Sequence, residues 1–173
     1  MPSEPGATAV IDDVTCRPPT VEDGASVWRL VRDSGQLDLN SSYAYLLMCQ
    51  EFSATCAVAE IGGELAGFVT GFRPPQRPDT LFVWQVGTSA AARGRGIASR
   101  MILDILQRRD APAFRYLEAT VDPDNEPSRA LFTGLARKLE TGLDETDYFI
   151  AGHFPGEHAP EPLFRIGPFH IHH

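Results

Sequence analysis

The sequence reads WQVGT at residues 84–88 and, after a short loop, RGRGIA at residues 93–98. Aromatic and β-branched residues fill positions 81–88 and predict a strand, and the apolar spacing of residues 95–108 predicts a helix. The glycines between the two elements let the main chain approach a ligand closely. The first turn of a helix offers unpaired N–H groups and the positive end of the helix dipole, so this stretch suits an anion such as a pyrophosphate.

A second strand and helix follow the first pair. Residues 114–121 are typical of a strand, and DPDN at 122–125 leads into EPSRALF at 126–132. Asn125 is a candidate cap for a helix that runs to about Lys138. A glycine-rich helix start on its own has an ordinary structural explanation. The second unit in this order is what favours a binding site over that explanation.

The rest of the chain supplies further strands and helices. Helices are predicted from the pattern after Thr20 to Ser34, and from Ser41 or Ser42 to Gln50. Gly62-Gly63 is a hairpin turn in this scheme. The order indicates an α/β (α+β mixed) protein with a central mixed, mostly antiparallel sheet flanked by helices on both faces. The remaining strands are predicted at 14–17, 54–61, 64–72, 148–151 and 163–166.

Length, composition and charge narrow the function classes. The chain has 173 residues, with 43% hydrophobic and 22% charged residues, which is ordinary for one globular domain. No apolar run reaches the roughly 18 residues of a membrane helix, and no secretory signal is found, so we expect a cytoplasmic protein without a membrane partner. The net charge of −8 disfavours nonspecific binding of nucleic acid. We expect a disordered segment at 1–13, the domain at 14–168 and a tail at 169–173.

Three cysteines, Cys16, Cys49 and Cys56, lack the spacing of a metal site. We expect them to be reduced and mostly buried thiols of a cytosolic protein. The histidines of the last five residues are not taken as metal ligands, because they belong to the expected tail. No metal is therefore predicted.

The two strand-and-helix units together resemble the GNAT superfamily of acyl-CoA-dependent N-acetyltransferases. Arg93, Gly96 and Ala98 match the family pattern Arg/Gln-x-x-Gly-x-Gly/Ala. The pattern Asn-x-x-Ser/Ala-x-x-Leu-Phe/Tyr is matched by Asn125, Ser128, Leu131 and Phe132. The resemblance implies acetyl-CoA as acetyl donor, direct attack of an amine on the thioester within a ternary complex, and a homodimer. The residues it implies for CoA binding are Val86, Thr88, Arg93, Gly94, Arg95, Gly96, Ile97, Ala98, Asn125 and Phe132.

Other stretches resemble one branch of that superfamily, the L-2,4-diaminobutyrate acetyltransferases of ectoine biosynthesis. The resemblance implies transfer of an acetyl group to the γ-amine of L-2,4-diaminobutyrate. The product would be Nγ-acetyl-diaminobutyrate, the precursor of the compatible solute ectoine, and the cellular role would be osmotic protection. The matching stretches are VWRLV at 27–31, LDLNSSYAYLL at 37–47, FSATC at 52–56, LFVWQV at 81–86, HFPG at 153–156 and PLFRIGP at 162–168.

Polar residues in the first of these stretches suit such a substrate, which carries a carboxylate, an ammonium group and the reacting amine. Asp33 and Asp38 suit the ammonium groups, and Trp84 suits the aliphatic chain. Each has an ordinary alternative: helix capping for residues 40–42, a solvated loop charge for Asp38 and a core aromatic for Trp84. The predicted acceptor residues are Asp33, Asp38, Asn40, Ser41, Tyr43, Trp84 and Gln85.

Glu118 is the predicted general base, because it lies on an otherwise apolar strand and burial raises the pKa of a carboxyl toward working pH. A surface-facing carboxylate is the alternative. Many members of the superfamily place a tyrosine just after the second motif as the acid for the thiolate, and this chain has Phe132-Thr133 there. Tyr148 and His153 are candidates for that role instead.

Two other functions stay open on the sequence. One is an acetyltransferase of the same fold that acts on a different small amine or on a protein N-terminus. The other is a non-catalytic module that binds acetyl-CoA, which the missing tyrosine favours. Release of the CoA thiol in the presence of diaminobutyrate distinguishes both from the first prediction.

Overall fold

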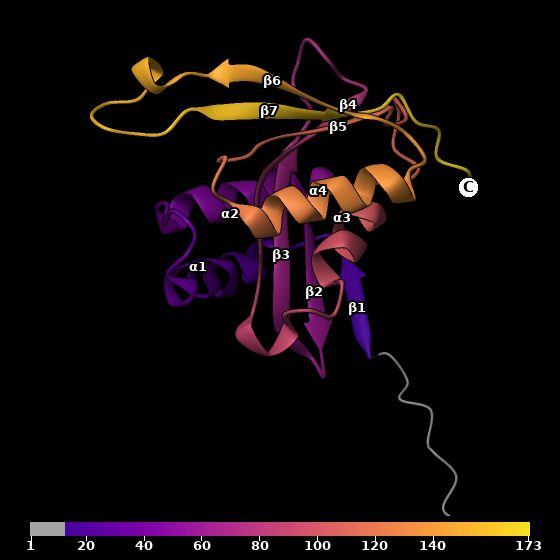
Figure 1. The fold of residues 1–173 in the computed structure, drawn as a ribbon. Helices are drawn as coiled ribbons and strands as arrows, with labels where there is room; N and C mark the ends of the chain where they lie inside the picture. Colours follow the sequence, from indigo (N-terminus) through magenta and orange to yellow (C-terminus); the bar gives the residue numbers. More distant parts are fainter. Residues whose placement is uncertain (1–12) are drawn as a thin grey trace, which may run out of the picture.

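The computed structural model describes residues 13–173, so the predicted disordered segment lies outside the described residues apart from Asp13. The strands form one sheet in the order β1-β2-β3-β4-β5-β7-β6 (Figure 1). β4 and β5 are parallel, and every other neighbouring pair is antiparallel. The predicted mixed, mostly antiparallel sheet is confirmed. The strands are β1 (Val14–Arg17), β2 (Ala57–Ile61), β3 (Glu64–Phe72), β4 (Thr80–Thr88), β5 (Tyr116–Thr120), β6 (Leu143–Phe149) and β7 (Glu161–Ile166).

Helices cover both faces of the sheet. Side chains alternate between the two faces along a strand, and this alternation divides the core. Val58 and Phe68 pack with α1 and α2 on one face. Ala57 and Val69 belong to the larger core, which α3 and α4 complete on the other face. Among the described residues, no helix has the length and apolar composition needed to cross a membrane. The helices are α1 (Gly24–Ser34), α2 (Ser42–Glu51), α3 (Ile97–Gln107) and α4 (Glu126–Lys138).

The helix caps predicted from the sequence are confirmed. The Ser41 hydroxyl oxygen accepts a hydrogen bond from the main-chain N–H of Ala44 at 3.3 Å and caps α2. The Asn125 side-chain oxygen accepts from the N–H of Ser128 at 3.1 Å and caps α4. These bonds satisfy N–H groups that have no partner inside the first turn of a helix. They fix where the two helices begin.

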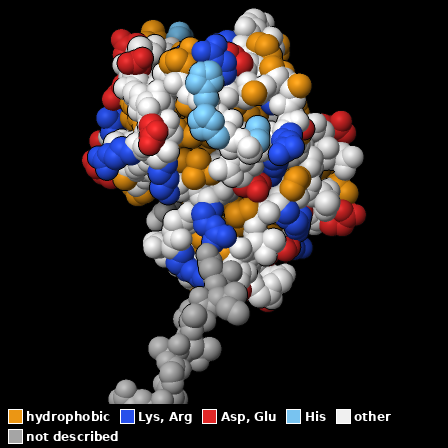
Figure 2. Space-filling view, turned by 90° about the vertical axis from the view of Figure 1, so that its right-hand side faces the viewer, with side chains coloured by type: hydrophobic (Ala, Val, Ile, Leu, Met, Phe, Trp, Pro, Cys, Tyr) orange, Lys and Arg blue, Asp and Glu red, His pale blue; other side chains and the backbone are white. Residues whose placement is uncertain are grey.

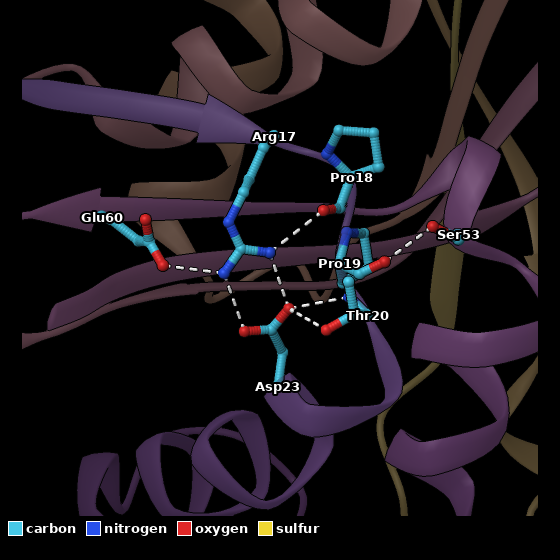
Figure 3. A network of polar contacts seen from close by, with 7 residues as sticks. All are labelled: Arg17, Pro18, Pro19, Thr20, Asp23, Ser53 and Glu60. Atoms are coloured by element: carbon cyan, nitrogen blue, oxygen red, sulfur yellow. Dashed lines mark hydrogen bonds and ion pairs between the residues drawn. The ribbon is translucent and has the colours of Figure 1, made fainter. Parts of the chain in front are cut away.

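The predicted pairing of Thr20 with Asp23 belongs to a network that ties β1 to the start of α1 (Figure 3). The Asp23 carboxylate accepts from the Thr20 N–H at 2.7 Å and from both terminal nitrogens of Arg17 at 2.8 and 2.9 Å. Arg17 also donates to Glu60 on β2 at 2.7 Å. The hydrogen bond from Arg17 holds the pKa of Asp23 below its ordinary value. One edge of the sheet is thereby joined to the first helix.

The later strands differ from prediction. The pattern predicts a strand at 148–151, but β6 runs over Leu143–Phe149, and Ala151–His153 forms a short 3-10 turn. β6 is exposed along almost its whole length, so it has no apolar face for a sequence pattern to report. It forms because it pairs with β7. At the other end of the sheet, residues 53–55 form a turn, and β2 begins at Ala57 instead of residue 54.

The last residues, predicted to be a tail, lie against the domain. Phe169 is buried in the core that α3 and α4 complete, and Ile171 packs against that core. The N–H of Phe169 donates to the carbonyl oxygen of Arg115 at 3.0 Å. Histidine side chains lie close together on the surface in Figure 2. Within residues 13–173, no group of three or more His, Cys, Asp or Glu side chains is arranged to hold a metal ion.

Candidate active site

The glycine-rich stretch forms a turn that leads into α3. Gly94 and Gly96 have φ angles of +75° and +71°, in the left-handed region where a side chain is strained. Apart from the adjoining residues, no described atom lies within 4 Å of the place that a Cβ would take on either glycine. Gly96 is the N-cap, and no side chain of residues 13–173 caps the helix there, so the first N–H groups of α3 are available to a ligand. An open turn with main-chain donors fits a pyrophosphate.

β4 and β5 separate as they approach this turn. They pair only where Thr80–Phe82 lies beside Tyr116–Glu118, whereas β4 continues to Thr88. Beyond Phe82, the edge of β4 that faces β5 has no strand partner in the described part of the chain. Its main-chain N–H and C=O groups therefore remain to be satisfied by water or by a ligand. Val86 and Thr88 lie on this edge, next to the turn.

A bulge in β4 lets two predicted acceptor residues, Trp84 and Gln85, contact the same side chain. The pairing of β4 with β3 shifts by one residue here, and Trp84 has no partner in β3. Bulges re-aim side chains in this way. The Trp84 ring stacks with that of Tyr45 on α2, with centroids 6.3 Å apart. The side-chain oxygen of Gln85 accepts a hydrogen bond from the Tyr45 hydroxyl at 2.9 Å.

Residues 38–40 lie against this bulge. The side-chain nitrogen of Gln85 donates to the main-chain oxygen of Asp38 at 2.8 Å. The Asn40 side-chain nitrogen lies 3.4 Å from the Tyr45 hydroxyl and 3.3 Å from the Asp38 carbonyl oxygen. The structure thus joins four predicted acceptor residues, Asp38, Asn40, Trp84 and Gln85, around Tyr45. Tyr45 was missed because its helical position indicates only a core side chain.

The other predicted acceptor residues lie apart from this network. Asp33 is exposed on α1 and accepts from the Nε of Arg32 at 2.8 Å. Ser41 caps α2, as its ordinary alternative predicted. Tyr43 is 66% exposed on the outer side of α2. Capping is enough to explain why Ser41 lies at the start of α2. That these three residues contact the substrate stays a prediction.

A second polar cluster lies on β5. Leu117 and Ala119 point into the core with α3 and α4, so Glu118 between them points to the opposite face of the sheet. Glu118 is only 1% exposed, which rules out the surface-facing alternative. Its two carboxylate oxygens accept from the guanidinium groups of Arg77, at 2.9 Å, and of Arg165. The two guanidinium groups therefore occupy both carboxylate oxygens, one of which a base would have to free in order to take a proton.

Tyr148 joins this cluster through Arg77. Burial lowers the pKa of Arg77, and its contacts with Glu118 and the Tyr148 side chain raise it by more, so the net change is upward. His153 lies in the turn after β6, is exposed, and accepts from the N–H of Ile150 at 3.3 Å. The structure therefore links Tyr148 to Glu118 through Arg77, whereas the His153 ring contacts that of Phe149, with centroids 6.4 Å apart. Their catalytic roles stay predictions.

Glu161 on β7 is a carboxylate that sequence reasoning missed. Thr120 follows Glu118 by two residues on the same face of β5, and its hydroxyl donates to Glu161 at 2.8 Å. Within residues 13–173, Glu161 makes no ion pair. The sequence offers no direct signal for it, because β7 comes to lie beside β5 only in the folded sheet.

The predicted CoA-binding residues fall into two groups. Those from 86 to 98 follow one continuous path from β4 through the turn to α3. Arg93 is exposed beside that turn, and Arg95 lies 3.6 Å from Asp13. Asn125 caps α4, and Phe132 is buried in the core. The first group is arranged as an anion site, while ligand contacts of Asn125 and Phe132 stay predictions.

Known proteins resemble this chain in sequence. The sequence model of the Acetyltransferase (GNAT) family matches residues 25–135. The L-2,4-diaminobutyric acid acetyltransferase of Marinococcus halophilus is 50% identical over 165 residues, which cover 95% of each chain. The protein of that name from Nocardia farcinica is 47% identical over 152 residues, covering 88% of this chain and 80% of that protein.

Solved structures resemble it in fold. The diaminobutyrate acetyltransferase EctA from Paenibacillus lautus, solved with its substrate L-2,4-diaminobutyric acid and coenzyme A, superposes with a TM-score of 0.85 at 42% identity, covering 92% of this chain and 97% of that one. Ard1 from Thermoplasma volcanium shares the fold alone, with a TM-score of 0.71 at 15% identity over 90% and 98% of the two chains. The chain belongs to the GNAT family of acetyltransferases and, within it, to the L-2,4-diaminobutyric acid acetyltransferases.

Proposed function

We propose that this chain transfers the acetyl group of acetyl-CoA to the γ-amine of L-2,4-diaminobutyrate, giving Nγ-acetyl-L-2,4-diaminobutyrate for ectoine biosynthesis and osmotic protection. The observation that carries the proposal is the similarity to the Paenibacillus lautus enzyme, whose structure holds both diaminobutyrate and CoA. The matched region covers 92% of this chain and 97% of that one.

The turn before α3 and the free edge of β4 hold the acetyl donor. Unpaired N–H groups at the start of α3 receive the pyrophosphate. The main-chain groups of β4 near Val86 and Gly87 receive the pantetheine arm and stabilise negative charge that develops on the thioester oxygen. Acetyl-CoA supplies the acetyl group, and the strands supply a fixed position for it.

The face of β4 that carries Trp84 and Gln85 holds the acceptor. In the described residues, the carboxylate of Asp38 makes no hydrogen bond or ion pair and is exposed. It is therefore available to an ammonium group of the substrate. The Trp84 ring is 39% exposed and offers an apolar wall to the aliphatic chain. Holding the amine beside the thioester lowers the entropic part of the barrier.

The amine must lose a proton before it attacks. A side-chain amine has a reference pKa of about 10, so the γ-amine is protonated at neutral pH. Glu118 is our predicted base, and the geometry adds Glu161 as a competitor, because a neutral hydroxyl rather than a cation binds it. Both carboxylates lie on the face of β5 away from α3 and α4. Tyr148 is the predicted acid for the CoA thiolate, next to Arg77.

Release of the CoA thiol tests the proposal. The purified chain is assayed with acetyl-CoA and diaminobutyrate, with shorter and longer diamino acids, and with a peptide N-terminus. We expect the highest kcat/KM for diaminobutyrate, and mass spectrometry with NMR should place the acetyl group on the γ-nitrogen. Higher kcat/KM for a peptide would contradict the proposal, and absence of thiol release with every amine would support the non-catalytic module.

We also infer a homodimer in the cytoplasm. β6 is an outer strand of the sheet, and the side chains of Tyr148 and Phe149 at its end and of Ile150 directly after it are exposed. An edge strand with exposed apolar side chains is commonly covered by another chain. Cys49 and Cys56 form no disulfide in the described residues, as is usual in reducing compartments. Light scattering coupled to size exclusion should give twice the chain mass, and a charged substitution at Ile150 should reduce it.

A further inference from the structure

Tyr45 is fully buried, with 0% exposure, although its hydroxyl is polar. Its ring packs edge-on against Phe68 at 6.5 Å and stacks with Trp84 at 6.3 Å, with 17° between the planes. A buried hydroxyl needs hydrogen-bond partners. The partners found in the described residues all belong to the acceptor side of the molecule.

The hydroxyl connects two of the elements that form this side. It donates to the side-chain oxygen of Gln85 at 2.9 Å. It also lies 3.5 Å from the main-chain nitrogen of Asn40 and 3.4 Å from its side-chain nitrogen, at the long end of hydrogen bonding. Gln85 is itself held by Thr70, whose hydroxyl accepts from its N–H at 3.2 Å. The segment 38–40 and the bulge of β4 therefore meet at one atom of α2.

This contact decides the orientation of the Gln85 amide. A primary amide has one accepting oxygen and one donating nitrogen. Because the Tyr45 hydroxyl takes the oxygen, the nitrogen faces Asp38 and donates to its carbonyl oxygen at 2.8 Å. The main chain of Asp38 is held in this way, while its carboxylate stays exposed.

We infer that Tyr45 is a positioning residue for the acceptor amine. It acts through Gln85 and Asn40, which hold Asp38, and through its stacking with Trp84. The inference rests on the proposed function and deepens it, because it names a residue that decides acceptor affinity and selectivity. Its role is separate from CoA binding, since the glycine-rich turn shares none of these contacts.

The Tyr45→Phe variant tests this inference, because it keeps the ring and removes only the hydroxyl. In this variant the buried side-chain oxygen of Gln85 loses its donor. The free-energy cost of such an unsatisfied group is enough to raise KM for diaminobutyrate on the order of tenfold. KM for acetyl-CoA should stay within about twofold of wild type, since that site keeps its contacts. Selectivity between diaminobutyrate and its longer and shorter homologues should narrow. Hydrogen exchange at residues 38–40 should become faster.

Thr55→Val is the matched control. Thr55 is also buried and its hydroxyl donates to the Gly71 carbonyl oxygen at 2.7 Å, but it contacts none of the acceptor residues above. We expect it to lower Tm by an amount similar to Tyr45→Phe while both KM values stay near wild type. A Tyr45→Phe enzyme that loses Tm like the control and keeps KM for diaminobutyrate, or raises both KM values equally, overturns the inference.

A double-mutant cycle asks whether Tyr45 acts through Gln85. If it does, adding Tyr45→Phe to Gln85→Leu should change KM for diaminobutyrate little further, whereas independent effects would multiply and contradict the route through Gln85. A wild-type chain that leaves diaminobutyrate unreacted contradicts the proposed function instead. The KM comparison then uses the amine that the chain does acetylate, and unchanged hydrogen exchange at residues 38–40 still overturns the inference.

Discussion

The glycine-rich turn and the network around Tyr45 are built in opposite ways. The turn offers main-chain groups at an exposed helix start, which no side chain in the described part of the chain caps. The network is made of side chains from α2, β4 and the segment 38–40, and its central residue is fully buried. A site made of main chain depends on glycines and on charge. A site made of side chains depends on single hydrogen bonds.

This difference predicts which of the two substrates binds more weakly after a given substitution. A new charge at the turn should weaken the binding of CoA and leave the binding of the acceptor unchanged, because the acceptor contacts lie on another face of β4. Loss of a polar group in the network should weaken the binding of the acceptor and leave the binding of CoA unchanged.

The largest effect is expected for Gly96→Asp. The new carboxylate would lie where the pyrophosphate binds, and like charges brought together cost several kcal/mol, so CoA affinity should fall by about a hundredfold or more. Gly62→Asp is the control, because Gly62 also has a positive φ, +59°, with no atom within 4 Å of the place that a Cβ would take, and lies in the β2–β3 hairpin. Calorimetry with CoA compares them. Equal affinities in two folded variants would remove the turn from the cofactor site.

The next effect concerns the two carboxylates on β5 and β7. If Glu118 is the base, Glu118→Gln should lower kcat by roughly ten- to a thousandfold, and the loss should shrink at alkaline pH, where free amine is available. Glu161→Gln should then have a smaller effect. The reverse ranking in kcat against pH assigns the base to Glu161. A deficit in Glu118→Gln that stays constant with pH indicates that the ion pairs with Arg77 and Arg165 organise the site instead.

A smaller effect is expected for Asp38→Asn, which keeps size and removes charge. KM for diaminobutyrate should rise on the order of tenfold, because a hydrogen bond to a charged group contributes about 1.5–3 kcal/mol when it is shielded from water and less when it is exposed. KM for acetyl-CoA should stay near wild type. Asp104→Asn is the charge control, because it removes a carboxylate on α3 that forms an ion pair with Arg108. Similar changes in both KM values would mean that Asp38 only supports the loop.

The smallest effect on the two substrates is expected at two buried thiols. Burial raises the pKa of Cys56 to about 12 and that of Cys49 to about 11, from 9.0. Above pH 9 the unfolded chain releases these protons and the folded chain keeps them, so stability present below this pH is lost as pH rises. The expected slope is about 1.4 kcal/mol per pH unit for each thiol. Urea unfolding of Cys56→Ser at pH 8 and pH 10.5 should show a shallower loss than wild type, and parallel losses would contradict it.

The main-chain site could be predicted from sequence because its parts are neighbours in the chain. The strand, the glycines and the helix start lie within residues 80–107, and the caps at Ser41 and Asn125 act over three residues. The partners of Glu118 could not be predicted in this way. Arg77 and Arg165 are 41 and 47 residues away and reach Glu118 only through the sheet.

Only some of the residues on the acceptor side could be predicted. Asp38, Asn40, Trp84 and Gln85 have polar or aromatic side chains that suit the substrate, and the network joins them. Tyr45 looked like an ordinary core residue of a helix, because burial of its ring is all that the pattern reports. β6 was placed too late in the sequence since both of its faces are exposed.

The strand order has a consequence for how the chain is completed during synthesis. β6 leaves the ribosome before β7, yet β7 is its only neighbour in the sheet that residues 13–173 form. β5 also waits, because it shares just three paired positions with β4 and gains its other edge from β7. The second half of the sheet therefore closes only when residues 161–166 have been made. Glu118 receives Arg165 at that moment, so its cluster of ion pairs is among the last parts of the enzyme to be assembled.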